Sequence, residues 1–524
     1  MCLLATPTLG WAQEPPAGAD TVPGGVYRRP LGHDPKTLDP ARVRDVYSLS
    51  VTGQIFDGLV HFDQTLSPLP ALAQFWKASR DNLTWTFTLR RGVTFHDGNE
   101  LTADDVVYSL TRLVDPRVNS AVAGLFGNIV GVQEYRAGTA PRVSGLMTID
   151  RYTVQIRLTE ASVPLVSTLA TGHAKIVPRA LVERDGDRFG DHPIGTGPFK
   201  FVSWERGKQI VLEPNRGYFD GPPRLGRVVF RIFPGEQVEA MYDEFRRGHL
   251  EDTPVPSRNY REVISQPNQV YVRRPQLGFR FYELNQRIKP LDDRRVRQAM
   301  IYAINREALV DTVFLGRYTW ARGILPPGTF GFNPSLKGYP YDPEKARDLL
   351  RQAGYPGGRG LPRIAVWSSA KRDEVVREHE RMKQDLEAVG IRIDVNYHTD
   401  WPSFTQMYSA GKLPVFLLAW FADVPEPDNF LFRLFHSKSP SNFTGYTNPV
   451  VDGLLDTARK THDAPQRADL YRRAEQVIVD DAAVIPIFHY SYEQLFQPYV
   501  RSIEVSGLGD PYLPLRKVWV DRPR

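Results

Sequence analysis

Cysteine is almost absent from this 524-residue chain, because Cys2 is the only one. An internal disulfide, a Cys-x-x-Cys redox pair and a zinc site built from thiolates each need two or more cysteines, so the sequence excludes all three. Long apolar runs are missing too, and the nearest approach is the segment 413–422. A membrane-spanning helix needs about 20 apolar residues, so this segment predicts a buried strand instead.

Signatures of catalysis are also lacking. The chain has no Gly-x4-Gly-Lys-Ser/Thr phosphate loop, no Gly-x-Ser-x-Gly elbow and no His-Glu-x-x-His pair. Its 11 histidines are scattered, with none three or four residues from another, which disfavours a metal site. Residues 195–197, Gly-Thr-Gly followed by proline, predict a turn entering a strand, and His96-Asp97-Gly98 is interpreted as a turn rather than an acid/base pair. We therefore expect no enzyme, no cofactor and no metal.

Charge of one sign does not dominate the sequence. The 66 basic and 60 acidic residues give a net charge of +6, and they are mostly interleaved, as in residues 371–374. Binding to DNA through its phosphates needs a clustered basic face, so no nucleic-acid partner is expected. A length of 524 residues implies two or three compact lobes rather than one core.

The first residues resemble a truncated signal peptide. Residues 1–12 are apolar and end in small residues, and a polar, proline-rich stretch follows to residue 23. A basic start is missing, and a lipoprotein cysteine would need an apolar stretch before it, whereas only Met1 precedes Cys2. We expect an exported protein in which residues 1–23 are a signal-peptide remnant and linker.

Strand and helix patterns alternate along the rest of the chain, which predicts an α/β build. Residues 85–89 and 154–158 alternate apolar with polar side chains, as half-buried strands do. Helix starts are expected at Thr102, at Asp342-Pro343 and near Asp292, from capping residues followed by an apolar stripe. A further helix is predicted over residues 373–389, followed by a strand over 391–395.

Trp420 and Asp423 are the residues that best indicate a binding site. An apolar strand over 418–422 runs directly into Asp423, and Pro425 and Pro427 stop it. One interpretation is a core strand that ends in a solvated turn. In the other, Trp420 walls a pocket and Asp423 stands at the strand end, where ligands commonly approach an α/β sheet.

Eight ordered motifs resemble those of the family 5 extracellular solute-binding proteins of bacterial ABC importers, which include dipeptide- and oligopeptide-binding proteins. The resemblance runs from about residue 26 to 520. The motifs are Thr37-Leu38-Asp39-Pro40, Ile55-Phe56-Asp57-Gly58-Leu59, Pro70-Ala71-Leu72-Ala73, residues 89–98, residues 101–106, residues 193–199, residues 290–299 and Tyr341-Asp342-Pro343-Glu344-Lys345-Ala346.

The resemblance implies a two-lobed periplasmic binding protein of the class II, or cluster C, type, with hinge strands and an extra subdomain. Domain II is expected to lie away from the ligand. The expected divisions are 24–60, 194–270 and 491–524 for domain I, 61–193 for domain II and 271–490 for domain III, the second lobe.

Site residues follow from the resemblance as well. In peptide-binding members, the Asp matching Asp423 pairs with the peptide's α-ammonium, and the Trp matching Trp420 lines a side-chain pocket. Trp401 resembles another pocket tryptophan, and Asn442 and Tyr446 are expected to border the cleft. The Trp-x-x-Asp pattern also occurs in members that bind other solutes, and residues 507–511 match no ligand motif.

The expected function is capture of peptides by hinge closure in the periplasm and delivery to the permease and ATPase subunits in the inner membrane, by a monomer. The alternative is the same role for a non-peptide solute such as a sugar, a metal chelate or haem. Two rivals stay open: a peptidase, for which no nucleophile with a base was found, and a docking or chaperone protein, which would show no ligand-induced closure.

Overall fold

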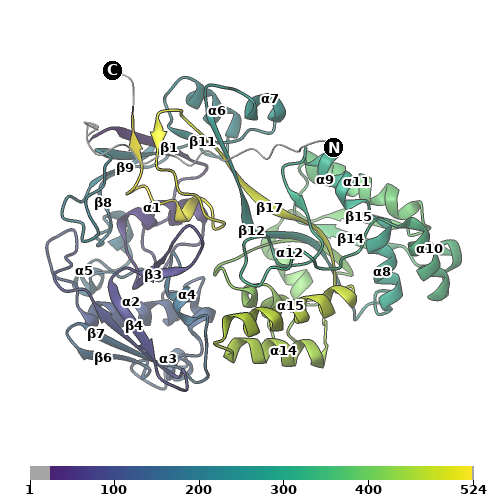
Figure 1. Cartoon of the computed structure of the whole chain (residues 1–524), viewed down its shortest axis with the longest axis horizontal. Helices are drawn as coiled ribbons and strands as arrows, with labels where there is room; N and C mark the ends of the chain where they lie inside the picture. Colours follow the sequence, from purple (N-terminus) through teal and green to yellow (C-terminus); the bar gives the residue numbers. More distant parts are fainter. Residues whose placement is uncertain (1–23, 522–524) are drawn as a thin grey trace, which may run out of the picture.

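Two long strands cross between the lobes of the computed structural model and join them (Figure 1). The structure describes residues 24–521, so the predicted signal remnant lies outside the described residues. Buried apolar side chains form three large clusters and one small one. The predicted mixed α/β build in two lobes with connecting strands is confirmed. Within the described residues, every helix is too short or too polar to cross a membrane.

Domain I in the first lobe is built on a four-stranded sheet in the order β1-β10-β9-β8, in which only β1 and β10 run parallel. Its elements are β1 (Val26–Leu31), α1 (Val46–Ile55), α5 (Arg179–Asp185), β8 (Phe199–Glu205), β9 (Gln209–Pro214), β10 (Arg227–Ile232), α6 (Val238–Arg246), α7 (Tyr260–Ile264), β18 (Val500–Arg501) and β19 (Trp519–Val520).

Domain II forms the other part of the first lobe around the sheet β4-β5-β7-β6. The two alternating segments of the sequence are β5 and β7, as predicted. The helix expected after Thr102 is α2, and its start is closed by the Asp105 carboxylate, which accepts a hydrogen bond from the Thr102 amide at 3.0 Å. The elements are β2 (Val60–Phe62), β3 (Pro68–Pro70), β4 (Ala73–Ala78), β5 (Thr84–Leu89), α2 (Ala103–Val114), α3 (Val132–Arg136), β6 (Leu146–Asp150), β7 (Thr153–Arg157) and α4 (Leu165–Leu169).

The largest sheet runs in the order β11-β17-β12-β16-β14-β15, with β13 paired to β17. Most of this sheet lies at the centre of the second lobe, whereas β11 lies at the first-lobe end of the crossing strands, beside β1 (Figure 1). The strands are β11 (Asp252–Pro254), β12 (Val270–Leu284), β13 (Thr319–Trp320), β14 (Ile364–Ser368), β15 (Ile393–Tyr397), β16 (Val415–Phe421) and β17 (Val484–Phe496). The helices are α8 (Arg294–Ala303), α9 (Arg306–Val313), α10 (Pro343–Gln352), α11 (Asp373–Glu387), α12 (Trp401–Ser409), α13 (Leu431–Phe435), α14 (Pro449–Lys460) and α15 (Ala464–Asp480).

The remaining sequence predictions for this lobe are confirmed. α10 begins where Asp342 and Pro343 predicted, and the Asp342 carboxylate accepts from the Lys345 amide at 2.8 Å. Asp293 caps α8, and α11 is followed by β15. The apolar segment 413–422 contains the strand β16, which is buried from Val415 to Leu418 and more exposed from Ala419 to Phe421, where it reaches the edge of the lobe.

β12 and β17 are the crossing strands, and their antiparallel pairing is interrupted between Pro275 and Phe279. At this break the Leu277 amide donates to the Gly507 carbonyl at 2.8 Å, and the Leu277 carbonyl accepts from the Ala422 amide at 2.9 Å. A break in the ladder lets paired strands bend locally. The junction of the lobes is therefore held by backbone bonds from three separate segments.

The divisions proposed at residues 60, 193, 270 and 490 stay a prediction. The second lobe has its own cluster between Leu277 and Phe488, and domain II has another. Val177, Val182 and Phe189, which the prediction gave to domain II, pack into the domain I cluster.

The Gly-Thr-Gly segment is a turn that leads into β8, as predicted. A side chain on Gly195 would place its Cβ 2.1 Å from the Ile55 carbonyl oxygen, and one on Gly197 would lie 2.4 Å from the Ile55 carbonyl carbon. His96 holds the same turn, because its Nδ1 accepts from the Gly195 amide at 3.3 Å and its Nε2 donates to the Gly197 carbonyl at 2.9 Å. Burial lowers the pKa of His96 to about 4, so the neutral ring fits this role.

We predict that Gly197→Ala destabilises the first lobe by about 1–3 kcal/mol, the usual effect of overpacking, because the new Cβ meets backbone atoms that cannot move freely. Thermal and urea unfolding followed by circular dichroism measure this. Gly453→Ala is the matched control: Gly453 lies on α14 with open space around it, so this change should be neutral or stabilising by up to about 1 kcal/mol. Equal stability of the two variants would contradict the prediction.

A buried carboxyl sits in the middle of the second-lobe sheet. Glu283 of β12 lies between Phe416 of β16 and Val484 of β17, and both of its oxygens lack a hydrogen-bond partner among the described residues. Burial raises the pKa of Glu283 from 4.5 to about 8. The folded protein therefore binds more protons than the unfolded chain between these two pH values.

Stability contributed by Glu283 is full below pH 4.5 and is lost as the pH rises towards 8, because its folded pKa is the higher one. We expect Glu283→Gln to be more stable than the wild type by on the order of 3 kcal/mol at pH 7, and by almost nothing at pH 4. Urea unfolding across this pH range measures the difference. Glu387→Gln, on the surface of α11, is the control, and a pH-independent difference for Glu283→Gln would refute the argument.

Candidate functional site

Asp423 stands directly after β16, at the edge of the second lobe that faces the first. The strand ends at Phe421, and a short 3-10 turn over Pro427–Asn429 follows. The Asp423 side chain is 45% exposed, and its Oδ2 accepts a hydrogen bond from Arg433 Nη1 of α13 at 2.8 Å. Within the described residues its Oδ1 makes no hydrogen bond. One carboxylate oxygen is thus open to a ligand.

Two side chains of the first lobe lie across from Asp423. The charge of Asp423 acts on His173, which follows α4, and on Tyr512, which lies in the C-terminal segment. Burial lowers the pKa of His173 and raises the pKa of Tyr512 to about 12, so both face Asp423 as neutral groups. The Tyr512 hydroxyl accepts from the Gly172 amide at 2.9 Å. Asp423 therefore faces the space between the lobes.

Trp420 is half-buried beside Asp423. Its indole Nε1 donates to the Asn429 carbonyl at 2.9 Å, and the Arg433 guanidinium lies 5.2 Å from the centroid of its ring. Trp401 opens α12 and is 53% exposed, with its ring against Phe404. Contact of Trp420 or Trp401 with a ligand stays a prediction.

Asn442 and Tyr446 hold each other in the loop after α13. The Asn442 amide donates to the Tyr446 carbonyl at 2.7 Å, and the buried Tyr446 hydroxyl donates to Asp481 Oδ2 at 2.8 Å. Burial and the Asp481 charge raise the pKa of Tyr446. Both residues secure this loop to the end of α15, and their contact with a ligand stays a prediction.

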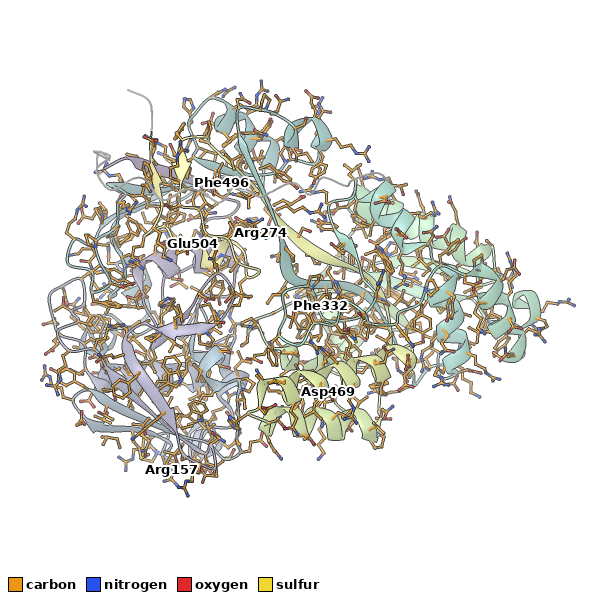
Figure 2. The ribbon with its side chains drawn as sticks, in the orientation of Figure 1. Arg157, Arg274, Phe332, Asp469, Phe496 and Glu504 are labelled. Carbon is orange, nitrogen blue, oxygen red and sulfur yellow. The ribbon has the colours of Figure 1, made fainter. Side chains whose placement is uncertain are left out.

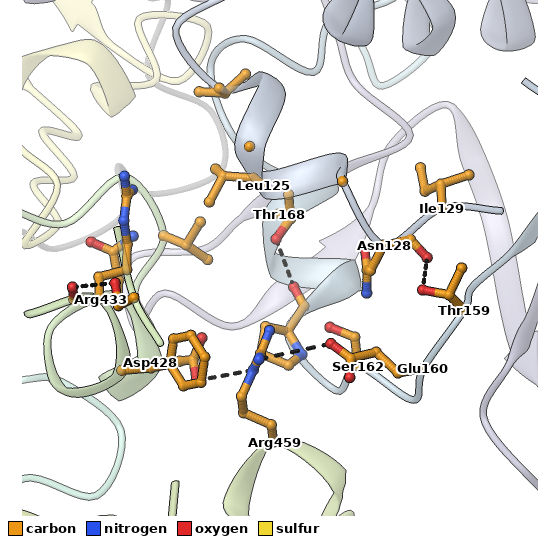
Figure 3. Close-up of a pocket in the computed structure, with 18 of the residues that line it drawn as sticks. Leu125, Asn128, Ile129, Thr159, Glu160, Ser162, Thr168, Asp428, Arg433 and Arg459 are labelled. Atoms are coloured by element: carbon orange, nitrogen blue, oxygen red, sulfur yellow. Dashed lines mark hydrogen bonds and ion pairs between the residues drawn. The ribbon is translucent and has the colours of Figure 1, made fainter. Parts of the chain in front are cut away.

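A cavity of about 650 Å³ lies between domain II and the second lobe, next to Arg433 (Figure 3). Domain II, which the resemblance places away from the ligand, forms one of its walls. The domain II side includes Leu125, Asn128, Glu160, Ser162 and Thr168, and the second-lobe side includes Val424, Glu426, Asp428, Phe432, Arg433 and Arg459.

Several contacts join the domain II wall of the cavity to the second-lobe wall. Arg459 pairs with Glu160 of domain II at 3.8 Å and with Asp428 of its own lobe at 3.4 Å. The Ser167 hydroxyl of α4 donates to Glu426 Oε1 at 3.1 Å. These residues gave no recognisable signal in the sequence, because their partners come from distant segments of the chain.

The segment 507–511, which matches no ligand motif, is held by β1 and by the crossing strand β17. Arg29 of β1 pairs with Asp510 at 2.7 Å and with Asp252 of β11 at 2.9 Å, and the Tyr492 hydroxyl of β17 donates to Asp510 at 2.5 Å. Burial raises the pKa of Asp252 to about 6. Figure 2 shows Phe496 of β17 near this junction and Arg274 of β12 between the two lobes.

Two lobes joined by crossing strands, with a partly exposed carboxylate facing the space between them, are the architecture of a solute-binding protein that closes by a hinge (Figure 1). The family of bacterial extracellular solute-binding proteins, family 5 (middle region), matches residues 67–442. The chain belongs to this family.

Relatives and solved structures agree with this assignment. The dipeptide-binding protein of Escherichia coli strain K12 is 28% identical over 92% of this chain and 91% of its own length. The glutathione-binding protein GsiB of Salmonella choleraesuis is 30% identical over 87% of each chain. HbpA2 of Haemophilus parasuis has a TM-score of 0.83 at 25% identity and covers 95% of this chain and all of its own. DppA of Helicobacter pylori, solved with the peptide STSA, has a TM-score of 0.76 at 27% identity over 95% of this chain and 98% of its own. The predicted fold class is confirmed.

Loss of the Arg459 contact should favour separation of the lobes. We predict that Arg459→Gln shifts the distribution towards a more open form, by at most about fivefold, because partly exposed ion pairs contribute about 0.2–1 kcal/mol. Small-angle X-ray scattering of the ligand-free protein would show a larger radius of gyration. Arg473→Gln, which removes a pair with Asp469 inside α15, is the control. An unchanged radius for Arg459→Gln would show that this contact does not govern closure.

Proposed function

We propose that this protein is the extracytoplasmic substrate-binding component of an ABC transporter that captures peptides by hinge closure. It acts as a monomer in the periplasm and delivers its ligand to the permease and ATPase subunits of the inner membrane. The observation that supports this function most directly is the half-exposed Asp423 carboxylate, which faces Tyr512 and His173 across the space between the lobes. The dipeptide-binding relative and the peptide complex of the Helicobacter pylori protein point the same way.

Asp423 has the chemistry of a receptor for a peptide's α-ammonium. A charge-assisted hydrogen bond between an ammonium and a carboxylate strengthens when surrounding water is excluded. Trp420 and the exposed Trp401 supply apolar surface for the first side chains, and Asn442 and Tyr446 hold the loop behind them. Backbone groups of the crossing strands suit hydrogen bonds to an extended peptide, which do not depend on its sequence.

Closure turns binding into a change of shape. The ligand first binds to one lobe, and the other then closes about the interrupted β12–β17 pair, where backbone pairing already breaks at residues 276–278. The Glu160–Arg459 and Ser167–Glu426 contacts form only when the lobes approach. A micromolar ligand supplies about 8 kcal/mol, enough to hold the closed form that the permease recognises.

The alternative ligand is a non-peptide solute, such as a sugar, a metal chelate or haem. The Asp423–Arg433 pair supports this alternative, since the carboxylate already has a cationic partner without a ligand amine. The peptide-binding names of the relatives favour the first proposal.

We predict that Asp423→Asn lowers the affinity for peptides with a free amino terminus by about 10- to 100-fold, since a hydrogen bond to a charged group contributes about 1.5–3 kcal/mol. Isothermal titration calorimetry with Ala-Ala, Ala-Ala-Ala and Ala-Ala-Ala-Ala measures this. N-acetylated peptides should bind the wild type weakly and show little further loss in Asp423→Asn. Asp469→Asn on the outer surface of α15 is the matched control. Unchanged affinity in Asp423→Asn would remove the ammonium role.

A further inference from the structure

Arg433 both contacts the proposed ammonium site and lines the neighbouring cavity. Its Nη1 donates to Asp423 Oδ2 at 2.8 Å, its guanidinium lies over the ring of Trp420, and the same side chain lines the 650 Å³ cavity (Figure 3). Arg433 is 36% exposed and Asp423 45% exposed. A ligand in the space between the lobes can therefore reach both charges.

The other ionised groups around this pair are already matched. Arg459 is shared by Glu160 and Asp428, and Glu426 pairs with Arg467 at 2.8 Å. The groups that face Asp423 from the first lobe, His173 and Tyr512, are neutral. Arg433 uses one of its five N–H donors on Asp423 and keeps others for a second acceptor.

The balance of charge decides which ligand group fits. A lone ammonium would be attracted by Asp423 and repelled by Arg433, so the two effects would partly cancel at this short distance. A group that carries an ammonium and a carboxylate on one carbon offers an opposite charge to each. A guanidinium binds a carboxylate especially well, because its planar donors match the two oxygens.

We infer that Arg433 is a specificity-determining residue, and that Asp423 and Arg433 together receive a zwitterionic head group. The favoured ligands are peptides whose first residue keeps its α-ammonium and α-carboxylate on the same carbon and joins the rest of the peptide through its side chain, as a γ-linked glutamyl residue does. The cavity beside Arg433 leaves room for the carboxylate. This inference rests on the proposed function, since it names the kind of peptide that the site selects.

Isomeric peptides test the head group directly. γ-Glu-Ala and α-Glu-Ala have the same atoms and the same net charge, and Gln-Ala has the ammonium without the extra carboxylate. Each head group is placed on dipeptide, tripeptide and tetrapeptide chains of alanine, and affinities for the full purified chain are measured by calorimetry. We expect γ-glutamyl peptides to bind at least about tenfold more tightly than the glutaminyl and α-glutamyl peptides of the same length.

Substitution of Arg433 assigns the preference to this side chain. Arg433→Met should lower the affinity for γ-glutamyl peptides by about tenfold or more and raise that for glutaminyl peptides, because Asp423 loses its competing cation. Arg433→Lys keeps the charge and should keep part of the preference. Arg473→Met on α15 is the matched control, and circular dichroism checks that each variant folds.

Three results of these measurements would contradict the proposals. Glutaminyl peptides that bind the wild type as tightly as γ-glutamyl peptides would overturn the inference and leave peptide capture standing. Equal losses for both head groups in Arg433→Met and Arg433→Lys would show that Arg433 only supports the loop. No binding by any peptide of any length would overturn the proposed function and this inference together.

Discussion

The pairing of β12 with β17 is the constraint on which the rest of the structure depends. These are the strands that cross between the lobes, and β11, β13 and β16 pair directly with one or the other of them. The ladder breaks at residues 276–278, and Gly507 and Ala422 supply backbone bonds there. Backbone hydrogen bonds therefore still hold the lobes together at the place where the β12–β17 pairing is interrupted.

Buried charges reinforce this arrangement on both sides of the junction. In the first lobe, Arg29 joins β1, β11 and the C-terminal segment through Asp252 and Asp510. In the second, Arg280 of β12 pairs with Glu378 of α11 at 2.5 Å. Burying ions is costly, so such pairs fix one arrangement more than they add stability. Each pair therefore ties together segments that are far apart in the chain, β1 to β11 and the C-terminal segment in the first lobe and β12 to α11 in the second.

The charged pairs at the facing edges of the lobes differ from these buried pairs. Here the charged pairs are partly exposed and modest in energy, as for Glu160 with Arg459 and Asp423 with Arg433. Contacts of this strength can form and break as the lobes move. Contacts this weak leave most of the free energy of closure to a ligand that touches both lobes.

The sequence by itself determined the local structure and the family. Capping residues such as Asp342, the alternation at residues 85–89 and the apolar segment before Asp423 depend only on neighbours along the chain, so they could be read directly. The sequence also predicts the Gly-Thr-Gly turn. It does not predict why glycine is needed there, which is the close approach of the Ile55 backbone to both glycines. Only the tertiary structure decided that Arg433 pairs with Asp423, that Tyr512 lies across from Asp423 and that domain II forms one wall of the cavity. Those facts depend on distances between segments far apart in the chain, and such distances are fixed by how the lobes pack rather than by any local pattern.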